Sequence, residues 1–284
     1  MSTPEIRAAS PRVGRAFRSR SVGRAVVCLV AALCVLPLSA GEGGACPSPE
    51  EMRARLERLG LERGSRTAKF DMPVPKDLLD KACKQIGKPF TMRDGDKGEG
   101  VIVAEVPVEA VWKALNDENR HAEEGSPVPV MYSEVIEGTP RGESRLIFQW
   151  TKKMGFGRWW VSHVWMNGEL FETSKGKLWE LRWEGQSDKA DPEAYPMSTV
   201  SSDLKPVEFS EGAWLLVSLG ESCTLIEYFN WTDPGGGMVG FTQPMVFTKG
   251  LRQTAAGMAE LAEQYRSSTP SGPVFMLPDG TPLD

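Results

Sequence analysis

Residues 223–265, CTLIEYFNWTDPGGGMVGFTQPMVFTKGLRQTAAGMAELAEQY, decide the fold. Residues 224–231 are rich in aromatic and branched side chains, which is typical of a β-strand. The DPGGG sequence at 233–237 ends that strand, because proline lacks a backbone N–H and the glycines free the chain. From about residue 239 to 266, apolar side chains recur every three or four positions, which predicts a long helix with one apolar stripe. We expect this helix to lie against the strands that precede it.

Most of the chain before this stretch has the patterns of β-strands. Pro107 opens a predicted helix over residues 108–115, and Asn167-Gly168 predicts a tight hairpin. Alternating or fully apolar runs predict strands over residues 100–106, 130–137, 143–151, 158–166, 178–184 and 208–219. Shorter helices are predicted over residues 50–63 and 76–86, and a long polar insertion over residues 186–204.

This order predicts an α+β protein with a helix-grip architecture. A curved antiparallel sheet of about seven strands would wrap around the long C-terminal helix, with extra helices at the N-terminus. The last residues are rich in proline and glycine, a composition that favours an unfolded tail.

The N-terminus has the layout of a secretory signal peptide. Six arginines precede the apolar run 25–38, and small residues follow as far as Ala40. The apolar run is shorter than the roughly 20 residues that span a bilayer, so we expect cleavage near Ala40 and export to the periplasm or the medium. An uncleaved membrane anchor is the alternative. Cleavage would remove six Arg and one Glu and take the formal charge from −5 to −10, which argues against nucleic acid as a partner.

Three of the five cysteines follow the predicted cleavage point: Cys46, Cys83 and Cys223. In an oxidising compartment one disulfide is expected, and Cys46 with Cys83 is favoured because both flank predicted N-terminal helices. Cys223 would then be a free thiol at the start of a strand. No Cys and His spacing indicates a metal site, and we expect no cofactor.

Two stretches resemble the START lipid-transfer family of the helix-grip (START-like, SRPBCC) superfamily. They are residues 100–112 (GVIVAEVPVEAVW) and residues 228–236, with their DPGG, leading into residues 241–261. The resemblance covers roughly residues 97–265. It implies a cavity between sheet and C-terminal helix that holds one hydrophobic molecule, such as a sterol, a phospholipid or a polyketide. It also leaves open a transient contact with a membrane for ligand exchange.

We therefore divide the chain into four parts. They are a signal peptide (1–40), an N-terminal linker with two short helices (41–96), a START-like ligand-binding domain (97–267) and a flexible tail (268–284).

The tryptophans independently favour a cavity. All nine lie between Trp112 and Trp231, and large side chains set far apart on a curved sheet tend to line a space. A solid aromatic core is the alternative. The residues that we expect to line the cavity are Phe148, Trp150, His163, Trp165, Trp179, Trp183, Trp214, Tyr228, Phe241, Met245 and Met258.

Few residues indicate catalysis, and we assign no catalytic residue. His121 lies in a charged loop and is expected at the surface, as are Arg145 and Arg182, which lie opposite the apolar faces of their strands. His163 lies in mid-strand, either as a core histidine or as a group that faces the cavity. Glu227 lies in an apolar strand and would face either solvent or ligand.

The sequence thus favours an exported protein that binds a lipid or another hydrophobic small molecule, for transfer or storage. The first alternative is a cyclase, aromatase or hydrolase that uses His163 or Tyr228 as acid or base. The second is a non-catalytic interaction module, in which the two-sided apolar strand 158–166 packs against a partner.

Overall fold

The computed structural model describes residues 45–60, 63, 72–153, 156–186, 204–233, 242–267 and 271–283. All of them belong to one compact unit, residues 42–284. The predicted signal peptide, most of the insertion 186–204 and the break at 234–237 lie outside the described residues.

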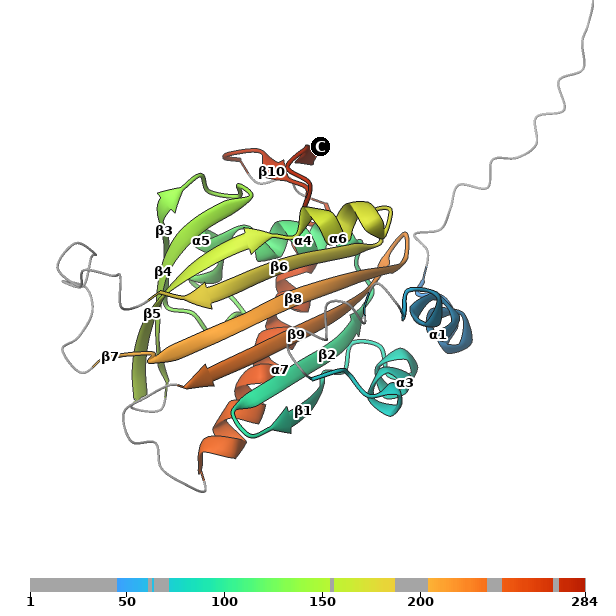
Figure 1. Ribbon diagram of the computed structural model, residues 1–284, viewed down its shortest axis with the longest axis horizontal. Coiled ribbons are helices and arrows are strands. Elements are labelled where there is room, and N and C mark those ends of the chain that lie inside the picture. Colours follow the sequence, from blue (N-terminus) through green and yellow to red (C-terminus); the bar gives the residue numbers. More distant parts are fainter. Residues whose placement is uncertain are drawn as a thin grey trace, which may run out of the picture. The chain divides into compact units, whose positions relative to one another are not determined.

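A nine-stranded sheet forms the body of the described part (Figure 1). Its order is β1-β2-β9-β8-β6-β5-β4-β3, with antiparallel pairing along this path, while the short β7 pairs parallel with β5. The sheet is not closed. The strands are β1 Phe90–Asp94, β2 Lys97–Ala104, β3 Tyr132–Gly138, β4 Ser144–Lys153, β5 Phe156–Met166, β6 Leu178–Gly185, β7 Lys205–Pro206, β8 Phe209–Gly220 and β9 Cys223–Asp233.

Helices lie on both faces of this sheet. The long α7, Thr242–Glu263, packs on one face beside α4, Val108–Leu115, and α5, Glu118–His121, follows α4 in the chain. The helices α1, Pro49–Arg58, and α3, Lys76–Lys84, pack on the other face. An antiparallel sheet that holds a long C-terminal helix confirms the predicted α+β, helix-grip fold.

The sheet has an inner face, which packs against α7, and an outer face, which packs against α1 and α3. The inner face carries Ile147, Val164, Trp214 and Tyr228, which belong to or pack against the apolar cluster that includes Met258 of α7. The outer face carries the alternate side chains, such as Val101, Leu215 and Leu225, which pack with the apolar residues of α1 and α3. Strand alternation sends successive side chains to opposite faces.

Two glycines let α7 approach one side of the sheet closely. A Cβ atom on Gly98 of β2 would overlap the side chains of Leu251 and Phe247 on α7. A Cβ atom on Gly100 would lie 3.2 Å from the backbone oxygen of Leu251. The helix therefore rests on β2, near one edge of the sheet, and β4, β5 and β6 lie several strands away along the sheet.

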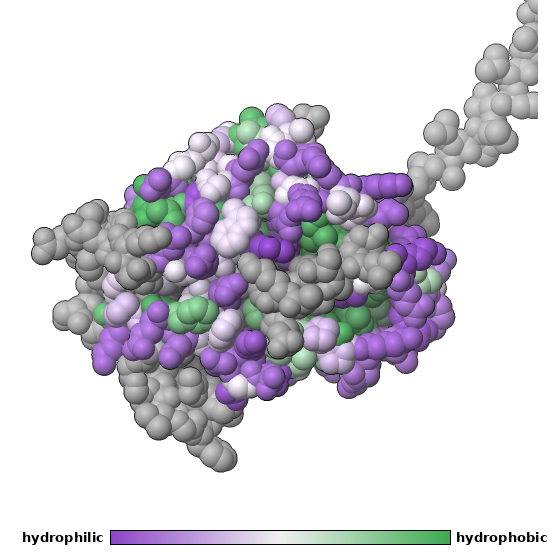
Figure 2. Space-filling view, viewed as in Figure 1, coloured by the Kyte–Doolittle hydropathy of each residue, from purple (hydrophilic) through white to green (hydrophobic). Residues whose placement is uncertain are grey.

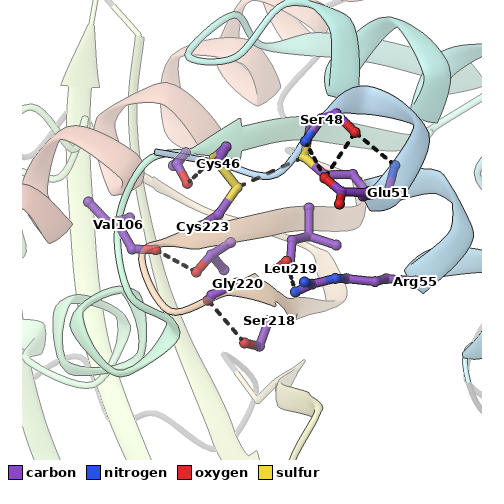
Figure 3. Close-up of a disulfide and its surroundings, with 12 residues drawn as sticks. Cys46, Ser48, Glu51, Arg55, Val106, Ser218, Leu219, Gly220 and Cys223 are labelled. Atoms are coloured by element: carbon purple, nitrogen blue, oxygen red, sulfur yellow. Dashed lines mark hydrogen bonds between the residues drawn. A yellow bond between two sulfur atoms is a disulfide. The ribbon is translucent and has the colours of Figure 1, made fainter. Parts of the chain in front are cut away.

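The N-terminal layer is bound covalently to the outer side of the sheet (Figure 3). Cys46 forms a disulfide with Cys223, the first residue of β9. This corrects the predicted Cys46–Cys83 pair, because Cys46 lies at the end of β2, with its Sγ 3.9 Å from the oxygen of Ala104. Cys83 is instead a buried free thiol on α3.

Two local features differ from what the sequence led us to expect. Residues 90–94 form β1, which pairs with β2 and was not among the predicted strands. Asn167 does not make a tight hairpin but caps a short helix, α6, Gly168–Thr173, by accepting a hydrogen bond from Leu170 N at 3.2 Å. Asparagine followed by glycine suits both structures, since Asn is also a favoured helix cap.

The C-terminal segment is packed rather than unfolded where the structure describes it. Strands β10, Phe275–Met276, and β11, Pro282–Leu283, form a hairpin. Phe275 is buried, with the guanidinium of Arg141 4.1 Å from its ring centroid. Trp112 also donates a hydrogen bond from Nε1 to the oxygen of Met276 at 2.7 Å. One buried aromatic anchor thus outweighs a composition that is typical of disorder.

Candidate ligand-binding cavity

A cavity of about 340 Å³ lies between the inner face and the helices α4, α5 and α7. Its volume is at the lower end of the range of roughly 300–1,000 Å³ found for small-molecule sites. The apolar part of the described wall consists of Leu115, Val128, Pro129, Val130, Ile147, Trp160, Val164, Leu181, Trp183, Val207, Trp214, Tyr228 and Met258. The polar part consists of Glu118, His121, Gln149, Thr151, Ser162, Ser210, Asn230, Thr232 and Thr254.

Three aromatic rings form the centre of the sheet side of this wall. The ring centroid of Tyr228 lies 4.2 Å from that of Trp214 and 5.7 Å from that of Trp183, in stacked arrangements. Gly212 of β8 is paired in the sheet with Trp183 of β6. A Cβ atom on Gly212 would overlap the indole of Trp183. The absence of a side chain at position 212 therefore lets the Trp183 indole lie across β8 towards Tyr228.

Several polar groups of the wall bond to protein partners. Thr151 donates to the oxygen of Pro129 at 2.8 Å, and Thr232 donates to the oxygen of Phe209 at 2.9 Å. Gln149 links Ser133 and Trp160 through hydrogen bonds of 3.0 and 3.1 Å. These polar groups of the wall are therefore already paired with protein atoms.

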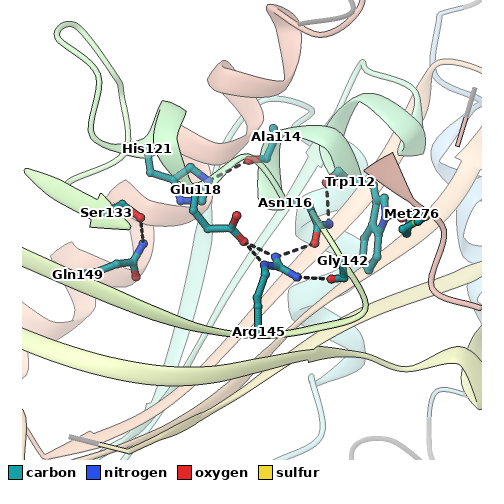
Figure 4. A network of polar contacts seen from close by, with 10 residues as sticks. All are labelled: Trp112, Ala114, Asn116, Glu118, His121, Ser133, Gly142, Arg145, Gln149 and Met276. Carbon is teal, nitrogen blue, oxygen red and sulfur yellow. Dashed lines mark hydrogen bonds and ion pairs between the residues drawn. The ribbon is translucent and has the colours of Figure 1, made fainter. Parts of the chain in front are cut away.

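A buried ion-pair network closes the end of the cavity near α5 (Figure 4). Arg145 of β4 forms an ion pair with Glu118 and donates to Asn116 Oδ1 and Gly142 O at 2.8 and 2.7 Å. Arg145 is only 2% exposed, which corrects the prediction of a surface residue. Its guanidinium points from β4 towards Glu118 and Asn116, so the charge is neutralised inside the protein rather than in solvent.

His121 also corrects a surface prediction. It lines the cavity, is 7% exposed, and places Nε2 2.8 Å from the backbone oxygen of Ala114. Burial lowers the pKa of His121, although the nearby Glu118 acts in the opposite direction. The imidazole is therefore neutral at neutral pH and donates its Nε2 proton to the carbonyl.

The structure brings together four of the side chains that the sequence assigned to the cavity. Trp183, Trp214, Tyr228 and Met258 line it. Trp179 belongs to the same apolar cluster but packs beside the cavity, with its ring centroid 5.5 Å from Trp112. Phe241 and the side chain of Met245 lie outside the described residues.

Four of the residues assigned to the cavity lie on the outer face instead. Phe148 and Trp150 alternate with the inner-face residues of β4 and therefore point to the outer face. The ring centroid of Phe148 lies 6.2 Å from that of Trp159. His163 and Trp165 are the other two, and their ring centroids lie 5.1 Å apart in a stacked arrangement. His163 Nε2 also forms a 2.7 Å hydrogen bond with Ser144 Oγ. Both faces of these strands carry aromatic side chains, so the sequence alone could not identify the inner one.

The proposed acid and base residues are also separated. Tyr228 faces the cavity, whereas His163 lies on the outer face, so the sheet stands between them. The sequence did not single out Glu118, His121, Ser162 or Asn230 as lining residues. Strand alternation could have identified two of them, because Ser162 and Asn230 each lie two positions from an inner-face residue of the same strand.

No group of three or more His, Cys, Asp or Glu side chains could hold a metal ion in the part of the chain that the structure describes. Over the same residues, no helix is both long and apolar enough to cross a membrane.

The strand order and the long final helix together define a helix-grip fold. Human STARD10 has a similar structure, with a TM-score of 0.49 and 14% identity over 68% of this chain and 81% of that chain. The STAR-related lipid transfer protein from Xanthomonas axonopodis matches with a TM-score of 0.45 and 16% identity over 63% of this chain and 99% of that chain. The Zhui aromatase/cyclase from a Streptomyces species matches with a TM-score of 0.41 and 14% identity over 63% and 98%.

No family model and no curated protein matches the sequence. The fold of this chain is established by its own strand order and final helix, and the names above describe only the proteins that bear them.

Proposed function

We propose that this chain binds one hydrophobic, lipid-like small molecule between the inner face and α7. The observation that carries the proposal is the cavity of about 340 Å³ with the stacked rings of Trp183, Trp214 and Tyr228 in its wall. Concave, largely apolar sites with a few placed polar groups are the usual form of small-molecule sites. Loading or release during transient contact with a membrane is part of this proposal, and Met131, which is 53% exposed and directly follows the lining segment 128–130, is where we would place that contact.

Export through the signal peptide at residues 1–40 is part of this proposal. The basic, apolar and small-residue order of that segment supports it. The Cys46–Cys223 disulfide supports it too, since disulfides persist in oxidising compartments. The mass of protein recovered from the export fraction of a producing cell should match a chain that starts near Gly41. A full-length chain there would contradict cleavage.

Binding is tested by titrating delipidated protein with N-phenyl-1-naphthylamine, an uncharged dye that fluoresces in apolar surroundings. We expect saturation at one dye per chain, and native mass spectrometry of the untreated protein should show a co-purified small molecule. Absence of both would overturn the proposal.

Neighbouring residues of β5 offer a matched pair of variants. Ser162 lines the cavity, and His163, the next residue, points to the outer face. Ser162→Phe should fill part of the cavity and weaken dye binding about tenfold or more, whereas His163→Phe should change it less than about twofold. Equal effects of the two variants would mean that the dye binds elsewhere.

A further inference from the structure

Four polar side chains in the cavity wall have no hydrogen-bond partner. Among the described residues that line the cavity, Ser162, Tyr228, Asn230 and Thr254 make no side-chain hydrogen bond. Their polar atoms are also absent from the fully enclosed unsatisfied groups of the described part, so they border the open space. Ser162 is only 4% exposed. Buried polar groups are normally paired, and an unpaired set around a cavity indicates a ligand that pairs them.

Tyr228 is held as a hydrogen-bond donor. Its ring contacts both Trp183 and Trp214, which fixes the direction of the hydroxyl. Burial alone raises the pKa of Tyr228 far above neutral pH, so the phenol keeps its proton. Asn230 lies two residues further along β9 on the same face and adds one amide donor group and one acceptor. This part of the wall therefore offers donors to an oxygen atom of the ligand.

The charges of the wall disfavour an anion. Glu118 lines the cavity, and its partner Arg145 is not among the lining residues. Among the described lining residues there is no Lys or Arg. A carboxylate or phosphate placed in this cavity would lose its hydration without gaining a counter-charge from the described wall, which is costly.

Resting on the proposed function, we infer that the ligand is an uncharged amphiphile. Its polar end carries a carbonyl or hydroxyl oxygen that accepts a hydrogen bond from Tyr228 and contacts Asn230. Its apolar part lies against Val164, Leu181 and Met258. The small volume suits one chain or a compact ring system rather than a lipid with two long chains.

Two ligands with the same chain test this inference. 1-Monododecanoylglycerol is uncharged, and dodecanoate is an anion at pH 7.5. Each is used below its micelle concentration to displace N-phenyl-1-naphthylamine from the delipidated protein. We expect the monoacylglycerol to displace the dye at a concentration at least about tenfold lower, because the anion would be buried without a counter-charge. Equal or stronger displacement by dodecanoate would overturn the inference and leave the proposed function standing. If the dye does not bind and no small molecule co-purifies with the protein, the proposed function itself fails.

Tyr228→Phe removes one hydroxyl and keeps the ring. It should weaken binding of the monoacylglycerol roughly three- to tenfold, the usual effect of one neutral hydrogen bond. The control is Tyr132→Phe, whose hydroxyl bonds to the exposed Glu134 on β3, away from the cavity wall. An unchanged affinity in Tyr228→Phe, or an equal loss in Tyr132→Phe, would overturn the role of Tyr228.

Discussion

In strands β6 and β9, buried carboxylates of the outer face pair with arginines, whereas polar side chains on the inner face of β9 border a cavity. On the outer face, Glu227 is fully buried and pairs with Arg63, and Glu180 is fully buried and pairs with Arg182 at 2.6 Å. On the inner face, Tyr228 and Asn230 make no side-chain hydrogen bond and border a cavity.

This difference separates a structural face from a binding face. The helices α1 and α3 cover part of the outer face, where the buried carboxylates of Glu227 and Glu180 pair with Arg63 and Arg182. A buried outer-face atom without a hydrogen-bond partner, Trp150 Nε1, is fully enclosed and does not belong to the cavity wall. The view of Figure 2 also shows mainly hydrophilic residues, with hydrophobic ones in separate places, where the surface is coloured. The presence of polar residues among apolar ones does not by itself indicate a site. What indicates one is a set of polar groups left unpaired beside an open volume.

The largest expected effect comes from breaking the inner ion pair. Arg145→Met would leave the buried Glu118 without its partner and should cost about 3–5 kcal/mol of unfolding free energy. Arg182→Met is the outer-face counterpart. It should cost less, because the Arg182 side chain is 19% exposed and Asn167 still donates to Glu180 at 2.6 Å. Urea unfolding measures both.

The double variant Arg145→Met with Glu118→Leu separates loss of the pair from loss of packing. Removing both charges should restore much of the stability that Arg145→Met alone loses. Equal losses of unfolding free energy in Arg145→Met and Arg182→Met would show that the inner ion pair does not depend on its partner more than the outer one does.

The second effect concerns the outer layer alone. Replacing Cys46 and Cys223 by alanine removes a cross-link between residues 177 apart and should cost about 2–4 kcal/mol. Amide hydrogen exchange should accelerate in α1 and α3 and much less in α7, since the disulfide ties only the N-terminal layer to β9. Cys83→Ala controls for loss of a buried thiol. Equal acceleration in α7 would show that the two faces are not independent.

The fold could be predicted from the sequence where the periodicity was long. The strands predicted over residues 208–219 and 224–231 are observed as Phe209–Gly220 and Cys223–Asp233. The described part of the C-terminal helix, Thr242–Glu263, lies within the predicted range. Apolar residues that alternate over about ten positions indicate a strand, and apolar residues that recur every three or four positions over about twenty indicate a helix.

The side of the sheet that faces the cavity could not be predicted, because both sides are aromatic. On β5, Trp159 packs on the outer face and Trp160 lines the cavity, so neighbouring identical residues have opposite surroundings. Alternation divides a strand into two sets and does not say which set meets the helix. That choice depends on contacts with α7, such as those that Gly98 and Gly100 permit.

Buried charges were missed for a related reason. Within its own strand Arg145 lies opposite an apolar face, which is typical of a surface residue, yet its partner Glu118 lies 27 residues earlier on α5. A local pattern carries no information about such a partner. The same holds for Cys46, whose partner Cys223 is far away in the chain, whereas the predicted partner Cys83 was near.

A third effect tests how the inner face is shaped. Gly212→Ala should displace the Trp183 indole and cost about 1–3 kcal/mol, because an added methyl group in a filled site forces its neighbours to move. Dye binding should weaken together with stability. Adding Trp183→Leu should restore part of the stability by removing the overlapping indole. The remaining loss would reflect the backbone oxygen of Phe229, 2.5 Å from the added Cβ. No loss in Gly212→Ala would contradict the close packing.

The smallest effect is a pH dependence that His121 adds to the inner face. Because burial lowers its pKa, the folded protein binds the His121 proton less strongly than the unfolded chain, whose histidine has a pKa near about 6.5. The neutral histidine therefore contributes full stability above that pH. Stability should fall as the pH drops below it, by up to about 1.4 kcal/mol per pH unit.

His121→Gln should remove this part of the pH dependence while carboxylates elsewhere titrate as before. The measurement is the difference in urea unfolding free energy between pH 7.5 and pH 5.5, compared between His121→Gln and the unchanged protein. We expect the difference to be smaller in the variant. His163→Gln, at a half-buried position on the outer face, controls for the loss of one imidazole. If the variant loses as much stability on acidification as the unchanged protein, His121 is not held neutral by its surroundings.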